Sequence, residues 1–273
     1  MENKVIDSDL KTIKLFFLIS HLLPFLITAI LMILEKSFFI SNQLYSSLIY
    51  FSLLSPTFAA LFILYFHYYR EDRIDYWHRL IDFKRISSEW YFVIFGLPIF
   101  IRIIAAVSAL LFSSTYFQFY FSPTMTFSYA VLLLFFGPIP EEMGWRGIAL
   151  PKLMRKCGFN QATIFLGFMW AIWHLPLFFV EGTYQYQLVP GSSLFWNFMF
   201  DIFFTTFIYS MIYIKTNQSI MAVILFHFMD NFSGEAFIIT ERALLISTFV
   251  RGIIAFCIFL KMKKVSFGSH IQE

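Results

Sequence analysis

Long apolar runs separated by short polar segments dominate this chain. Each run has about 20 residues, the length with which a helix crosses the hydrocarbon core of a bilayer. The runs lie at about 13–34, 44–67, 91–114, 127–150, 160–180, 194–214, 218–238 and 243–260. The pattern therefore predicts an all-α, polytopic membrane bundle of about eight transmembrane helices.

The basic residues between the runs predict how the bundle is oriented. Lys and Arg accumulate on the cytoplasmic side of membrane proteins. With the N-terminus inside, 15 of the 20 basic residues fall in inside segments, and only Lys36 and Arg242 fall outside. The other three, Arg102, Arg146 and Arg251, lie within the runs. We therefore expect both termini to be cytoplasmic.

The segment from residue 70 to residue 90 mixes apolar and charged side chains. Ile74, Trp77 and Leu80 are spaced among the charges, a pattern typical of a helix that lies in the membrane interface. A solvated connector is the alternative interpretation.

Composition agrees with a membrane protein. The chain of 273 residues is 59% hydrophobic and only 14% charged, with a mean hydropathy of +0.72, whereas about a quarter of a soluble domain is charged. A net charge of +3 gives no indication of a nucleic-acid partner. Two cysteines without ligand-like spacing argue against a disulfide scaffold and a cysteine-ligated zinc site. Without repeats or a large soluble loop, residues 1–273 are predicted to form one integral membrane domain.

Two adjacent carboxylates and an arginine follow the apolar run that begins at residue 127. Glu141, Glu142 and Arg146 lie where an ionised side chain is costly unless it faces the protein interior or water, which makes them functional candidates. On a helix, Glu142 and Arg146 are i,i+4 neighbours, and Glu141 is turned away by roughly 100°. We expect Glu142 to pair with Arg146 and Glu141 to face a cavity.

Two later runs carry the other polar candidates. His174 follows Trp170 by four residues, and Asn231 follows His227 by four, so each pair shares one helix face. At the rise of a helix, Glu141, His174, His227 and Asn231 lie roughly 15–21 Å from the cytoplasmic ends of their runs, near the middle of the bilayer. Each residue alone could simply join neighbouring helices, but four groups at one depth favour a site. We place the catalytic core at about residues 127–238.

These residue types suit the hydrolysis of a peptide bond. A carboxylate with a histidine can take a proton from water, and a histidine with an amide can donate hydrogen bonds to an oxyanion. Glu141, His174 and His227 could instead hold zinc. An Asn amide is a poor zinc ligand and no thiolate is present among these residues, which favours a reaction with no obligatory cofactor. No HExxH, GxSxG or opposed Asp pair is present.

Together the three motifs, which cover residues 137–232, resemble the CPBP family of CAAX-protease and bacteriocin-processing intramembrane endopeptidases, also called Abi. The resemblance implies that Glu141 and His174 act on the attacking water. It assigns His227 and Asn231 to the oxyanion or to a metal, and Glu142 and Arg146 to support. Trp170 stands where the family usually has Phe, and we expect it to keep an aromatic wall.

The resemblance also implies a biological setting. Eukaryotic members remove the last three residues of prenylated CAAX proteins, whereas many bacterial members act in bacteriocin immunity, peptide maturation or regulated proteolysis. We expect a membrane-associated peptide or protein as substrate, the lipid bilayer as surroundings and a bacterial plasma membrane as location. The alternatives are an immunity or scaffold protein without turnover and a transporter. A transporter would show paired broken helices in corresponding halves, and no such symmetry is visible.

Overall fold

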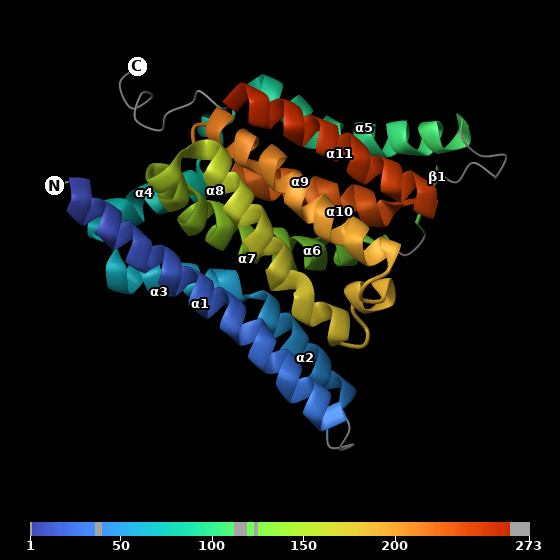
Figure 1. Ribbon diagram of the computed structural model, residues 1–273, viewed down its shortest axis with the longest axis horizontal. Coiled ribbons are helices and arrows are strands. Elements are labelled where there is room, and N and C mark those ends of the chain that lie inside the picture. Colours follow the sequence, from blue (N-terminus) through green and yellow to red (C-terminus); the bar gives the residue numbers. More distant parts are fainter. Residues whose placement is uncertain (1, 36–39, 112–118, 123–124, 263–273) are drawn as a thin grey trace.

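The computed structural model describes residues 2–35, 40–111, 119–122 and 125–262. Helices make up nearly all of this part of the chain (Figure 1). The long helices are α1 (Glu2–Glu35), α5 (Ser88–Leu111), α8 (Leu150–His174), α9 (Ser193–Lys215), α10 (Ile220–Ala236) and α11 (Glu241–Met262). The shorter helices are α2 (Asn42–Leu53), α3 (Ser55–His67), α4 (Arg70–Ile81), α6 (Phe127–Phe136) and α7 (Pro138–Gly144).

The remaining elements are single turns and one pair of short strands. A π-helix, η2 (Trp145–Ala149), joins α7 to α8, and the 3-10 turns are η1 (Phe83–Arg85), η3 (Leu175–Phe179) and η4 (Gln185–Leu188). In the described part of the chain, strands occur only as β1 (Phe119–Phe121) and β2 (Phe237–Ile239), which pair antiparallel. The predicted all-α, polytopic class is confirmed.

The number of spans is less simple than the apolar runs indicate. Five helical stretches of the described chain are long and apolar enough to cross a membrane, or six if the bent pair α2 and α3 is one span. One stretch, Phe127–Phe179, contains two of the predicted runs, and α10 has only 17 residues. The count of eight, the cytoplasmic termini and the division into one domain with its core at 127–238 stay predictions.

The segments predicted to be cytoplasmic lie together. Near the start of α1, Asp9 pairs with Lys152 of α8 at 2.7 Å. The connection after α4 meets the one between α9 and α10, where Arg85 Nη1 donates to the Asn217 carbonyl at 2.7 Å. α1 begins, and α11 ends, at the same end of the molecule (Figure 1). Helix α4 forms in the segment predicted to be an interfacial helix; its depth relative to a bilayer stays a prediction.

The glutamate pair lies in a broken stretch of helix in the interior. Gly137 separates α6 from α7, and the two prolines that follow remove backbone donors from the first turn of α7. The wide turn η2 then precedes α8, which kinks at Gly158, where φ is +73°. Such π turns are rare and are frequent at functional sites.

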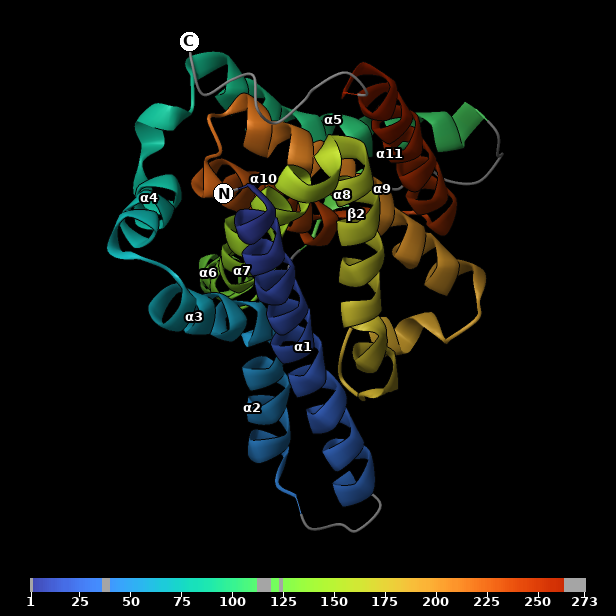
Figure 2. The ribbon, with the colours of Figure 1, turned by 60° about the vertical axis from the view of Figure 1, so that its left-hand side comes forward.

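Two glycines let neighbouring helices approach this broken stretch closely. A Cβ on Gly144 would lie 2.6 Å from the Pro56 side chain of α3, and a Cβ on Gly147 would lie 2.6 Å from the Tyr76 ring of α4. The Tyr76 hydroxyl donates to the Met143 carbonyl at 2.9 Å. Helices α3 and α4 therefore fix α7 and η2 from one side; Figure 2 shows α3 and α4 beside α7.

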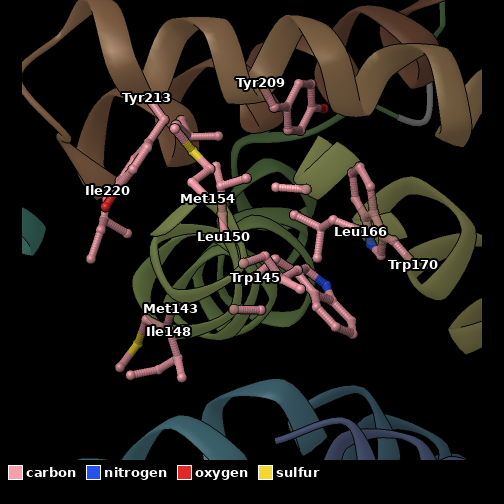
Figure 3. Close-up of a cluster of buried hydrophobic side chains, with 14 of the residues drawn as sticks. Met143, Trp145, Ile148, Leu150, Met154, Leu166, Trp170, Tyr209, Tyr213 and Ile220 are labelled. Carbon is pink, nitrogen blue, oxygen red and sulfur yellow. The ribbon is translucent and has the colours of Figure 1, made fainter. Parts of the chain in front are cut away.

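The opposite side of this stretch faces the core. Trp145, Ile148 and Leu150 are completely buried. In Figure 3, Leu150 lies on the side toward Tyr209 of α9, whereas Ile148 lies beside Met143 on the other side. The glutamate pair is thus held in a rigid, mostly apolar surrounding from which water is excluded on several sides.

Candidate active site

Glu142 joins two of the three motifs. Arg146 Nη1 donates to both Glu142 carboxylate oxygens, at 3.0 and 2.9 Å, and both side chains are completely buried. On its other side, Glu142 Oε1 lies 2.8 Å from His227 Nδ1 of α10. The predicted Glu142–Arg146 pair is present, and its carboxylate also orients His227.

Trp170 connects the other two candidate groups. Its indole Nε1 donates to Glu141 Oε2 at 2.6 Å, and its backbone carbonyl lies 2.8 Å from His174 Nδ1. A carbonyl oxygen only accepts, so His174 Nδ1 must carry the proton, and Nε2 of the neutral ring is left to accept one. Glu141 and His174 are 6% and 7% exposed. Both are therefore oriented, in low-dielectric surroundings, by one tryptophan.

The His227 ring is held between aromatic side chains from two other helices. Its centroid lies 5.5 Å from Trp170 and 5.2 Å from Tyr209 of α9. The Arg146 guanidinium carbon lies over both of these rings, 4.7 Å from Trp170 and 4.9 Å from Tyr209. This cation–π arrangement fixes the position of the arginine that holds Glu142.

Asn231 lies one turn beyond His227, at the break between α6 and α7. Its Nδ2 is 3.4 Å from the point that a Cβ on Gly137 would occupy, and the residue is partly buried. Glycine at position 137 therefore leaves the amide room beside the start of α7. The structure brings Glu141, His174 and His227 around Trp170, with Asn231 on the same α10 face as His227.

Two features of the site are not predicted by the three motifs. Trp170, expected to be an aromatic wall, also donates a hydrogen bond to Glu141. Tyr209 belongs to none of the three motifs but contacts Trp170 and His227, and its hydroxyl donates to Asp230 Oδ2 at 3.3 Å. An indole donor is visible in the sequence, but its target depends on the packing of α7 against α8. Tyr209 is one of many aromatic residues in the chain, so its place in the sequence does not mark it as part of the site.

A buried ion cluster lies next to the site. Arg251 of α11 pairs with Asp201 of α9 and with Asp230 of α10, and Thr248 Oγ1 donates to Asp201 at 2.8 Å. Asp230 directly precedes Asn231, so the cluster fixes the part of α10 that carries the amide. These residues hold three helices together.

The possible zinc ligands do not form a ligand set. Across the described residues, no three His, Cys, Asp or Glu side chains are grouped so that they could hold a metal ion. Glu141 receives the Trp170 indole hydrogen bond, and Nδ1 of each candidate histidine is directed to Trp170 or to Glu142. We therefore derive no step through a metal.

Comparison with known proteins agrees with this site. Residues 123–233, which contain all three motifs, match the family described as type II CAAX prenyl endopeptidase Rce1-like. The chain is also 32% identical over 198 residues to CAAX prenyl protease 2 of Methanococcus maripaludis, an alignment that covers 71% of this chain and 73% of that protein. The chain therefore belongs to the Rce1-like family of type II CAAX prenyl endopeptidases.

Proposed function

We propose that this multi-pass membrane protein is an endopeptidase that hydrolyses peptide bonds of membrane-associated substrates with water activated by Glu141 and His174. The observation that carries the proposal is the double contact of Trp170, whose indole binds Glu141 and whose carbonyl orients His174. A carboxylate and an imidazole are thereby both held by one residue in a buried place. The two contacts support the proposal, because general-base activation of water needs an oriented proton acceptor.

The proposed reaction has two steps. The water oxygen attacks the scissile carbonyl carbon while Glu141 takes the water proton, with His174 Nε2 accepting a hydrogen bond from the same water. The carbonyl oxygen becomes an oxyanion that Asn231 Nδ2 and His227 Nε2 stabilise. The C–N bond then breaks, and the leaving amine takes the proton from Glu141. The products are a carboxylic acid and an amine, and the enzyme returns to its starting state.

His227 can donate to the oxyanion only in one charge state. Since Nδ1 is directed to the Glu142 carboxylate, Nε2 carries a hydrogen at the same time only when the ring is an imidazolium, which donates from both nitrogens. Glu142 supplies the opposite charge for that state, and Arg146 holds Glu142 in place. The second glutamate and the arginine therefore support the oxyanion site without touching the substrate.

The matched relative indicates the kind of substrate. That archaeal protein is a CAAX prenyl protease, and the family resemblance implies cleavage near the C-terminus of a prenylated chain. We propose a membrane-anchored chain cleaved a few residues before its C-terminus as the substrate. A bacterial plasma membrane as the location stays a prediction, as do the roles in immunity or peptide maturation.

Replacing Asn231 by Ala tests the function and the oxyanion assignment. We expect purified wild-type protein in detergent to cleave a lipidated peptide, and Asn231→Ala to lower kcat by roughly 10²–10³ with little change in KM, as for the loss of an oxyanion donor. Asn42→Ala, at an exposed asparagine at the start of α2, is the matched control. Wild-type protein that binds the peptide without cleaving it would instead support the immunity or scaffold alternative.

Removal of metals tests the cofactor assignment. We expect cleavage to continue after dialysis against a strong chelator, because the proposed water activation uses only Glu141 and His174. Metal content is measured in parallel on the dialysed protein. Loss of activity on chelation, restored by one zinc ion per chain, would contradict this proposal and make Glu141, His174 and His227 the ligands.

A further inference from the structure

Helix α5 brings a buried guanidinium to the face of α10 that carries the third motif. Arg102 is 8% exposed. A Cβ on Gly234 of α10 would lie 2.8 Å from Arg102 Nη2. The guanidinium therefore occupies space that any side chain at position 234 would need, and glycine at this position lets Arg102 reach α10.

Gly234 shares its helix face with the candidate catalytic residues. It follows His227 by seven residues and Asn231 by three, spacings that place all three on one side of a helix. At 1.5 Å per residue, it lies about 10 Å beyond His227 and about 5 Å beyond Asn231 along the axis. The Arg102 guanidinium is thus about one turn beyond the proposed oxyanion site, on the same face.

Arg102 differs from the two other arginines that lie within apolar runs. Arg146 pairs with Glu142, and Arg251 pairs with Asp201 and Asp230. Among the described residues, Arg102 has neither an ion pair nor a hydrogen bond, and its Nε is buried without a partner.

The carboxylates nearest to Arg102 along α10 form no ion pair with it in the described part of the chain. Asp230 is already paired with Arg251. Glu235 is exposed and lies within electrostatic range of Arg102, but it forms no ion pair in the described part of the chain. A buried charge without a partner is unfavourable for folding, so a fixed cation here points to an anion that arrives with a ligand.

We propose that Arg102 binds the C-terminal carboxylate of the peptide that is cleaved. This inference rests on the proposed endopeptidase function. A guanidinium binds a carboxylate through two parallel hydrogen bonds. Two or three extended residues span about 7–10 Å, which matches the separation between the oxyanion site and the Arg102 guanidinium. Arg102 would thereby set the length of the C-terminal segment that is released.

A pair of peptides tests the inference. Both are the same lipidated peptide, one with a free C-terminal carboxylate and the other with a C-terminal amide. We expect wild-type kcat/KM to be roughly 10- to 100-fold higher for the free acid, because a hydrogen bond to a charged group is stronger than one to a neutral group. Arg102→Met should reduce cleavage of the free acid to the level of the amide, mainly through KM. Cleavage of the amide should be unchanged.

Two further variants separate recognition from folding. Arg102→Lys keeps the charge and should retain part of the preference for the free acid. Arg102→Met leaves no carboxylate without its partner, so its Tm should be unchanged or higher. Arg251→Met, the matched control at a paired arginine, should lower Tm. An Arg102→Met protein that cleaves both peptides less well, by the same factor, would show a structural role and contradict the inference.

A binding measurement tests recognition by Arg102 separately from catalysis. The Glu141→Gln protein should bind the free-acid peptide roughly 10- to 100-fold more tightly than the amide, and addition of Arg102→Met should remove the difference. Equal binding or equal cleavage of the two peptides would contradict the proposed carboxylate recognition but not the proposed endopeptidase function. Preferential binding of the free acid by a wild-type protein that cleaves neither peptide would contradict the proposed function and support the Arg102 site.

Discussion

Glu141→Gln is expected to reduce peptide cleavage by at least about 10³-fold, within the range that general acid–base catalysis supplies. Glutamine has the same shape and can still accept the Trp170 indole hydrogen bond, but it takes no proton from water. His174→Ala should cause a comparable loss, since it removes the imidazole nitrogen that orients the water. The measurement is kcat/KM on a lipidated peptide in detergent.

Folding must be monitored in the same experiment. Glu141 and His174 each form only one side-chain hydrogen bond among the described residues, so we expect both variants to elute as wild type from size exclusion and to unfold at a similar temperature. Glu89→Gln, at an exposed carboxylate near the start of α5, serves as the matched control and should retain full activity. Near-normal turnover by folded Glu141→Gln protein would exclude Glu141 as the base.

Arg146→Met should produce the largest loss of stability. The substitution leaves the completely buried Glu142 without its arginine, and stranding one partner of a buried ion pair typically costs about 3–5 kcal/mol. The cation–π contacts with Trp170 and Tyr209 are lost as well. We expect a lower yield of folded protein and a lower unfolding temperature, measured by thermal denaturation in detergent.

A double variant shows whether the stranded charge is the cause. Arg146→Met combined with Glu142→Gln has no buried carboxylate to strand, and the amide can still accept from His227 Nδ1. The double variant should therefore be more stable than Arg146→Met alone, because the two positions are directly coupled. If the single variant unfolds at the wild-type temperature, the pair has no role in holding α7 and η2.

The sequence predicts the site better than it predicts the spans. Residues four apart on one helix face have nearly fixed relative positions, so the Glu142–Arg146 pair and the shared face of His227 and Asn231 follow from spacing alone. The contact of Trp170 with Glu141 joins two helices. Its geometry depends on how α7 packs against α8, which no spacing within one segment specifies.

Apolar runs identify where the chain can enter a membrane, but not where helices begin and end. The run at about 44–67 is bent by 49° between α2 and α3, where Ser55 and Pro56 begin a new helix. The two runs between residues 127 and 180 are joined through α7, η2 and the kink at Gly158. Hydropathy averages over such breaks, and the number of crossings cannot be read from it.

Arg102 shows a second limit of sequence reasoning. It lies outside the matched residues 123–233, and in the sequence it is one of three arginines within apolar runs. Only the structure distinguishes them, because Arg146 and Arg251 have carboxylate partners and Arg102 has none among the described residues.

The π turn at Trp145–Ala149 constrains how this chain can change in length. A π turn holds about one residue more than an α turn, so loss of a single residue there would restore a regular helix instead of opening a loop. Each residue of a helix accounts for a rotation of about 100°, and α7 would turn by that amount relative to α8. Glu141 would then point away from Trp170, and Glu142 away from His227. Insertions and deletions between the glutamate pair and Trp170 should therefore be strongly selected against, although this interval lies in a helix whose hydropathy would hardly change.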